Sequence, residues 1–272
     1  MMLLKRKTSA ETLKLQEKYG VPYLVFPSLE NTGLVRHAFS TRLGGVSSLP
    51  HLQSMNLGEN RGDEPQNVQK NFDLLCQASG LPRKVVSGLQ IHSEKLLYAE
   101  DSFEEKPSCD GFYTDRQGLS LCVKVADCLP VLLYEPEANC IAALHAGWRG
   151  SARNIVGEGV KALLSLGARK EKILAAVGAG ISACCFAVRR DFVDEYCALV
   201  GGELSKRTLI SKEGQMHADL KELNRLLLLQ AGVTEEHLDV CPLCTCCQPD
   251  LFFSHRASGG LRGTMAALIA LP

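Results

Sequence analysis

The chain has 272 residues, of which 46% are apolar and 22% charged, and its 30 basic residues balance its 30 acidic ones. This length suits one large domain or two small ones, with enough apolar material for a core without disulfides. The net charge of zero argues against nucleic acid as a partner, because a phosphate backbone attracts a basic excess, and no apolar run is long enough to predict a membrane span.

The first 20 residues are charged, and we predict that they form a frayed helix that extends from a domain over residues 21–272. Lys5-Arg6-Lys7 follows the first four residues directly, which interrupts the apolar segment that a signal peptide requires. We therefore expect a cytoplasmic protein.

Strands and helices follow in mixed order along the rest of the chain. Apolar stretches predict strands over residues 23–26, 35–42, 85–90, 119–126, 131–134, 140–144, 173–177, 238–240, 251–253 and 265–271. Helical periodicity predicts helices over residues 63–79, 147–166, 190–200 and 218–231. Because strands and helices do not alternate strictly, the pattern favours an α+β fold.

Two histidines and one cysteine follow three of the predicted strands. His92, Cys128 and His145 each come where a strand ends. Strand ends lie side by side in a sheet, so these side chains can converge. One thiolate and two imidazoles suit a borderline-soft ion such as zinc, and three protein ligands leave a fourth position open, as in a catalytic site. The sequence therefore predicts a metal site at these three residues.

The chain has twelve cysteines, and four of them lie among apolar residues, where a cysteine usually serves as a small buried hydrophobe: Cys76, Cys122, Cys140 and Cys197. Cys241, Cys244, Cys246 and Cys247 form two overlapping C-x-x-C pairs. A structural zinc site needs four ligands, and the chain has no second C-x-x-C elsewhere. We interpret this segment as a cysteine-rich loop beside the core.

Six segments in a fixed order resemble the YfiH/YlmD family, long labelled polyphenol oxidase, laccase domain. They are FSTRLGGVS (39–47), QIHS (90–93), ADCLP (126–130), HAGWRG (145–150), CCF (184–186) and DLFFSHR (250–256). The resemblance runs from about residue 23 to the C-terminus, and the ordered set is specific although each segment alone is weak. The segment from Cys241 to Cys247 departs from the family pattern by its additional cysteines.

The resemblance implies a single four-layer α/β/β/α domain with mixed sheets, and zinc held by His92, Cys128 and His145. It implies purine nucleoside phosphorolysis, with adenosine, inosine and 5′-methylthioadenosine as substrates beside phosphate, and adenosine deamination in addition. Copper is the alternative metal that the laccase label suggests. A homodimer, or a muropeptide ligase in peptidoglycan editing, is the macromolecular partner to expect.

Three arginines are candidates for binding phosphate, because a guanidinium fork matches its oxygens. They are Arg42, Arg149 and Arg256. Arg42 is also followed by Gly44 and Gly45, whose backbone N–H groups are candidates for contact with an oxyanion. The alternative is that each arginine pairs with a surface carboxylate.

Two further residues are candidates for catalytic roles. Asp127 adjoins Cys128 and either orients a metal-binding histidine or caps the turn before Pro130. His255 either gives a proton to the departing purine or is a surface residue.

Three other functions remain open at the level of sequence. A Cys–His hydrolase would use Cys128 as the nucleophile and a histidine as its base. A factor in peptidoglycan-precursor editing would bind without turning over nucleosides. A copper-dependent polyphenol oxidase is disfavoured, because the seven histidines include no His-x-His pair.

Overall fold

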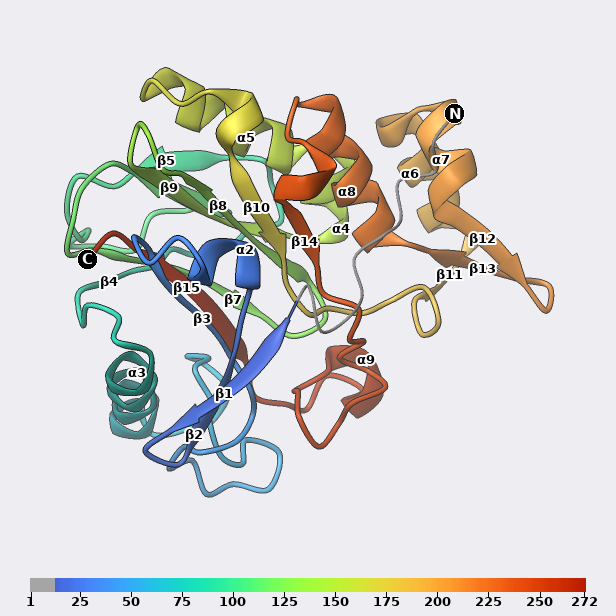
Figure 1. The fold of residues 1–272 in the computed structure, drawn as a ribbon. Helices are drawn as coiled ribbons and strands as arrows, with labels where there is room; N and C mark the ends of the chain where they lie inside the picture. Colours follow the sequence, from blue (N-terminus) through green and yellow to red (C-terminus); the bar gives the residue numbers. More distant parts are fainter. Residues whose placement is uncertain (1–12) are drawn as a thin grey trace.

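Two six-stranded sheets lie face to face in the computed structural model, which describes residues 13–272 (Figure 1). The strands of the first sheet, in spatial order, are β1 (Lys14–Lys18), β2 (Val21–Val25), β3 (Arg36–Ser40), β15 (Met265–Ala270), β7 (Ser120–Val125) and β4 (Val85–Val86). Those of the second are β14 (Leu238–Val240), β10 (Leu174–Val177), β8 (Leu129–Glu135), β9 (Cys140–Ala146), β6 (Gly111–Thr114) and β5 (Leu96–Tyr98).

The helices are α2 (Pro27–Glu30), α3 (Pro65–Ser79), α4 (Trp148–Ala152), α5 (Ile155–Ser165), α6 (Arg190–Val200), α7 (Gly202–Thr208), α8 (Leu220–Gln230) and α9 (His255–Ser258), with 3-10 turns at Lys170–Lys172 and Glu235–His237. They include α3 on the outer face of the first sheet and α4, α5 and α8 on the outer face of the second, whereas α2 packs between the edges of the two sheets. A small third sheet is formed by β11 (Ala187–Val188), β13 (Gln215–Ala218) and β12 (Leu209–Lys212). Figure 1 shows this sheet beside α6 and α7 at one end of the molecule.

The alternation of side chains along each strand produces the layers. Leu121 and Val123 of β7 point into the core between the sheets, whereas Cys122 faces α3 on the outside. In β8, Leu132 points between the sheets and Leu133 faces the layer of α4, α5 and α8. Because both faces of these strands are covered, apolar residues dominate them on both sides, although β7 also carries Ser120 and Lys124. The four-layer α+β arrangement expected from the resemblance is therefore confirmed.

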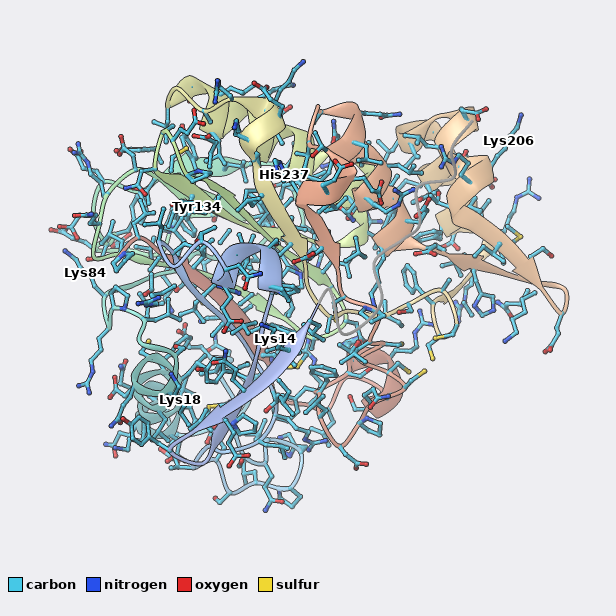
Figure 2. The ribbon with its side chains drawn as sticks, viewed as in Figure 1. Lys14, Lys18, Lys84, Tyr134, Lys206 and His237 are labelled. Carbon is cyan, nitrogen blue, oxygen red and sulfur yellow. The ribbon has the colours of Figure 1, made fainter. Side chains whose placement is uncertain are left out.

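The side chains follow this layering in the stick view. Tyr134 of β8 is fully buried and lies among the strands, whereas the exposed Lys84 and Lys206 project from the rim of the molecule (Figure 2).

The helix predicted over residues 1–20 is wrong where the structure describes it. Lys14–Lys18 forms strand β1, which pairs antiparallel with the buried β2, while residues 1–12 lie outside the described part of the chain. Pairing with an exposed sheet edge satisfies the backbone of this segment, and that gain outweighs its helical composition. The first sheet therefore begins at Lys14.

Two other predicted elements differ from the structure. The helix predicted from residue 147 is interrupted at Asn154, which adopts a left-handed conformation and caps α5 with its side chain. Residues 251–253 form no strand; Phe252 and Phe253 are apolar because they are buried, and Phe252 stacks on Phe39 at 5.9 Å between ring centroids. The helix predicted over 63–79 is confirmed as α3, which ends at the left-handed Gly80.

Candidate metal centre

The antiparallel pairing of β8 and β9 brings Cys128 and His145 together. In this register Leu129 lies opposite Ala146, and Pro130 lies opposite His145. Cys128 directly precedes β8, so it lies next to the end of β9 that carries His145. His92 reaches the same place from the loop after β4. The three ligand atoms lie within 4.8 Å of one another, and Cys128 Sγ is 3.9 Å from His92 Nε2. The structure thus brings together the three residues that the sequence predicts as metal ligands.

Asp110, directly before β6, fixes two of these three residues. Its carboxylate accepts hydrogen bonds from the backbone N–H groups of His92 (2.9 Å) and Ser93 (2.6 Å) and contacts His145 Nδ1 at 2.8 Å. His92 adopts a left-handed backbone conformation (φ 60°), which turns its N–H and that of Ser93 toward the same carboxylate. A carboxylate on Nδ1 holds the imidazole in the tautomer whose Nε2 is free to bind a metal.

The charges at the centre favour its ionised form. Burial would raise the pKa of the Cys128 thiol, but the neighbouring His145 and His92 lower it to about 6. Burial would lower the pKa of His145, but the Cys128 thiolate and the Asp110 carboxylate raise it to about 9. Burial would also raise the pKa of Asp110, and hydrogen bonds from His145 and Ser93 lower it to about 2.

This donor set fits a zinc ion with one open position. Bonds of about 2.0–2.3 Å in a tetrahedron place ligand atoms roughly 3.5 Å apart, close to the separations present here. His145 is buried, Cys128 is half-buried and His92 is exposed, so the centre opens toward solvent beside His92. Copper is also compatible with thiolate and imidazole ligands.

Gly147 leaves room for the centre, and replacing it should impair metal binding. A Cβ atom at this position would lie 2.7 Å from His92 Cδ2 and 3.5 Å from Cys128 Sγ. We expect Gly147→Ala to displace the His92 ring and to lower the zinc content, with little change in the melting temperature because His92 is exposed. Elemental analysis and thermal denaturation test this. Full zinc occupancy in Gly147→Ala would contradict the assigned position of His92.

The thiolate of Cys128 should be detectable in metal-free protein. Since its pKa is lowered to about 6, the thiolate should be present at pH 7 and be lost as the pH falls through 6. The measurement is thiolate absorbance against pH, taken as the difference between wild type and Cys128→Ser. A difference curve with a midpoint near the ordinary value of about 8.5 would contradict the pairing with His145.

Arg42 is engaged by backbone carbonyl groups. Its guanidinium donates to the carbonyl oxygens of Gln53 (3.1 Å) and Pro249 (2.8 Å) and lies 4.8 Å from the ring centroid of Phe253. The N–H of Gly45 donates to Ser54 Oγ at 3.0 Å. A Cβ at Gly44 would lie 2.5 Å from the Gly20 carbonyl oxygen, so this glycine allows close packing against the turn between β1 and β2.

The other predicted arginines also have protein partners. Arg149 forms a two-pronged ion pair with Glu195, at 2.9 and 3.0 Å, and covers the Trp148 ring. Arg256 donates to the carbonyl oxygens of Cys185 (3.0 Å) and Ala187 (3.1 Å). Both arginines line a groove of about 340 Å³ beside α4. His255 is exposed in the first turn of α9.

The Asp127 carboxylate makes its hydrogen bonds with groups other than the two metal-site histidines, His92 and His145. It accepts hydrogen bonds from Thr245 Oγ1 (2.6 Å), Ser254 Oγ (3.0 Å) and the N–H of Arg256 (2.7 Å). Asp127 itself is left-handed, with φ 86°. Its carboxylate therefore ties the Cys128 turn to the segments before and within α9, and the carboxylate that orients His145 is that of Asp110.

Sequence reasoning missed Asp110 and Arg262. Asp110 precedes β6, a strand that the apolar pattern does not predict, although an acidic residue before a strand is a signal of a site. Arg262 is half-buried, its Nε has no hydrogen-bond partner among the described residues, and it lies within electrostatic range of Cys128 and Asp127. Burial and the neighbouring Arg61 lower the pKa of Arg262 to about 10.

The chain is similar to known proteins over nearly its full length. A family model described as multi-copper polyphenol oxidoreductase laccase matches residues 36–272. A protein of Deinococcus radiodurans named purine nucleoside phosphorylase is 37% identical over 255 residues, which cover 93% of this chain and 94% of that protein. Purine nucleoside phosphorylase YlmD of Geobacillus stearothermophilus is 35% identical over 245 residues, which cover 85% and 88%.

Solved structures agree with these matches. The crystal structure of the Bacillus licheniformis hypothetical protein YfiH aligns with a TM-score of 0.86 at 30% identity, covering 95% of this chain and 99% of that one. Fold and sequence together define a laccase-type α+β domain with a Cys–His centre. The chain belongs to the YfiH/YlmD family, as the ordered segments predict. Within residues 13–272 we find no helix of the length and apolarity that crossing a membrane demands.

Proposed function

We propose that this protein is a zinc enzyme that cleaves purine nucleosides with phosphate and also deaminates adenosine. The observation that carries the proposal is the convergence of His92, Cys128 and His145 on one solvent-facing point. Its relatives named purine nucleoside phosphorylase supply the reaction class. Adenosine, inosine and 5′-methylthioadenosine are the substrates we expect.

The residues of the chain have separable roles in this proposal. When bound, zinc would supply a Lewis acid that activates water or polarises a substrate oxygen. Asp110 orients His145, and His145 in turn stabilises the Cys128 thiolate. In phosphorolysis a phosphate oxygen bonds to C1′ of the ribose while the bond from C1′ to the purine nitrogen breaks. We assign His255 to give the departing purine its proton.

The groove beside α4 is our candidate for the purine. Its wall includes Trp148 and Phe192, whose ring centroids are 4.6 Å apart, and α4 begins three residues after His145. Aromatic walls suit a flat heterocycle. Arg149 and Arg256 line the same groove and are our candidates for the polar edge of the substrate.

Arg262 is the strongest candidate for binding phosphate. Arg262 donates through Nη1 to the Gly263 carbonyl oxygen (3.1 Å) and to Thr264 Oγ1 (2.8 Å). Its Nε, however, is buried without a hydrogen-bond partner among the described residues, and the guanidinium lies within electrostatic range of Cys128. We expect Arg262→Ala to raise the phosphate KM by roughly 10–100-fold, because a charge-assisted hydrogen bond contributes about 1.5–3 kcal/mol. Phosphate-dependent kinetics at saturating inosine measure this. An unchanged phosphate KM would show that Arg262 does not bind phosphate.

The reaction itself has a direct assay. Inosine and phosphate should yield hypoxanthine and ribose 1-phosphate, and omission of phosphate should stop product formation. Adenosine should release ammonia with or without phosphate. Failure of phosphate to affect hypoxanthine release would exclude phosphorolysis.

One alternative rests on a specific observation. The lowered pKa of Cys128 beside His145 also suits a Cys–His hydrolase. If the protein is a Cys–His hydrolase, Cys128 of the metal-free protein should form a covalent acyl intermediate. If Cys128 is a metal ligand, bound zinc should protect its thiol from alkylation. The laccase description of the family keeps copper as the alternative metal, and elemental analysis distinguishes the two.

We place the enzyme in the cytoplasm, where reducing conditions preserve thiols, because all twelve cysteines are free. A homodimer or a complex with a muropeptide ligase is the assembly to seek. Size-exclusion chromatography with light scattering would detect the first of these.

A further inference from the structure

Four cysteine sulfurs from two separate loops form a group distinct from His92, Cys128 and His145. Cys184 and Cys185 come from the turn after β10, and Cys244 and Cys247 from the loop after β14. The four Sγ atoms all lie within 4.8 Å of one another. The sulfur of Cys247 is 3.6 Å from that of Cys184 and 3.3 Å from that of Cys185, and the adjacent pair is 3.7 Å apart.

The fold itself brings these loops together. β10 and β14 are parallel neighbours, with Val177 opposite Val240, so the chain leaves both strands at the same end. The contact continues beyond the strands: Gly180 pairs with Cys244, and the N–H of Thr245 donates to the Gly180 carbonyl oxygen at 3.2 Å. The cluster therefore rests on extended backbone pairing.

The spacing of the sulfurs fits a metal better than a disulfide. A disulfide would place its two sulfurs about 2.05 Å apart, much closer than the separations of 3.3–3.7 Å found here. Four thiolates around zinc, at about 2.3 Å each, lie roughly 3.8 Å from one another in a tetrahedron. The separations of 3.3–3.7 Å are close to the tetrahedral value for three of the four sulfurs.

Groups around the cluster suit its charge. The N–H of Ser182 points to the Cys244 sulfur at 3.3 Å, the kind of outer hydrogen bond that orients a metal-binding thiolate. Lys221 is 7% exposed, and its ammonium donates to Ser182 Oγ (2.9 Å) and to the Leu243 carbonyl oxygen (2.6 Å). Four thiolates and one divalent ion carry a net charge of −2, of which this buried cation offsets one unit.

We propose that Cys184, Cys185, Cys244 and Cys247 hold a second, structural zinc ion that joins the loops after β10 and β14. Four protein ligands leave no open position, so this ion would be structural rather than catalytic. The joined loops support the turn at Asp127, whose carbonyl oxygen accepts from the N–H of Ile181 at 2.8 Å. The second site thereby stabilises the turn next to Cys128.

Metal stoichiometry tests the proposal. Wild-type protein should contain two zinc ions per chain. Cys184→Ser combined with Cys247→Ser should lose one of them and keep the one at His92, Cys128 and His145, and His145→Ala should show the converse. Cys197→Ser is the control, because Cys197 lies on α6 and belongs to neither group of ligands, and it should keep both ions.

Cobalt replacement provides a test that does not require the double variant to fold. Cys128→Ser removes the thiolate of the first centre, so any thiolate-to-cobalt charge-transfer absorption in this variant comes from the four-cysteine cluster. We expect that absorption to persist. Absence of this absorption would overturn the proposal. So would iron in place of zinc, a disulfide within the cluster in freshly isolated protein, or equal zinc loss in Cys197→Ser. Inosine turnover is assayed separately, so failure here leaves the proposed function to its own test.

Discussion

Cys128→Ser and His145→Ala should each lose the zinc of the open centre and, with it, both inosine phosphorolysis and adenosine deamination. Each change removes one of only three ligands. The fall in kcat/KM should therefore exceed the roughly 10–100-fold loss that follows removal of an outer hydrogen-bond partner. Cys197→Ser and His237→Ala are matched controls on α6 and on the 3-10 turn before β14, and both should behave as wild type.

The readouts are zinc content by elemental analysis and initial rates with each nucleoside. Circular dichroism should show that the variants remain folded, because the surrounding strands keep their pairing. Wild-type zinc content with full activity in either variant would refute the assigned ligands. Zinc loss with full activity would show instead that the metal has no part in turnover.

Asp110→Asn should both weaken zinc binding and destabilise the fold. The Asp110 side chain is fully buried, and its carboxylate accepts hydrogen bonds from the loop of His92 while contacting His145. In Asp110→Asn, the side-chain NH2 would face N–H groups that now donate to the Asp110 carboxylate. We expect metal affinity to fall by about 10–100-fold, and the free energy of unfolding of metal-free protein to fall by about 1–3 kcal/mol.

Competition with a chelator measures the affinity, and denaturant unfolding measures the stability. Asp101→Asn, at an exposed position, is the control and should change neither. The pKa of Asp110 is lowered to about 2, so its contribution to stability is complete above its unfolded value and is lost as the pH falls toward 2. Asp110→Asn should lack this acid-dependent loss. Unchanged affinity and stability would show that Asp110 does not organise the centre.

The sequence predicts two of the three ligands well because Cys128 and His145 belong to one hairpin, whereas His92 comes from a separate loop. Cys128 precedes β8 and His145 lies near the end of β9, so the antiparallel pairing of this hairpin places them together at its open end. Asp110 could not be predicted in the same way. It acts through β6, a four-residue strand whose pairing with β9 joins segments about 30 residues apart.

The cysteine cluster shows a different limit. The C-x-x-C pairs between Cys241 and Cys247 have no second C-x-x-C segment as a partner in the sequence. The cysteines that meet them in the structure are the adjacent residues Cys184 and Cys185, which do not form that motif. Only the parallel pairing of β10 with β14 places these segments together. The pairing of Arg149 with Glu195 is equally non-local, since it joins α4 to α6. Short, exposed strands such as β12 also carry too little apolar pattern to be predicted.

Phosphorolysis of inosine by metal-stripped and zinc-reloaded protein tests the central claim most directly. Hypoxanthine and ribose 1-phosphate should be absent from the stripped protein, and should return in equal amounts when zinc is restored in the presence of phosphate. Stripped protein that still turns over inosine at the original rate, or reloaded protein that never consumes phosphate, would contradict the account.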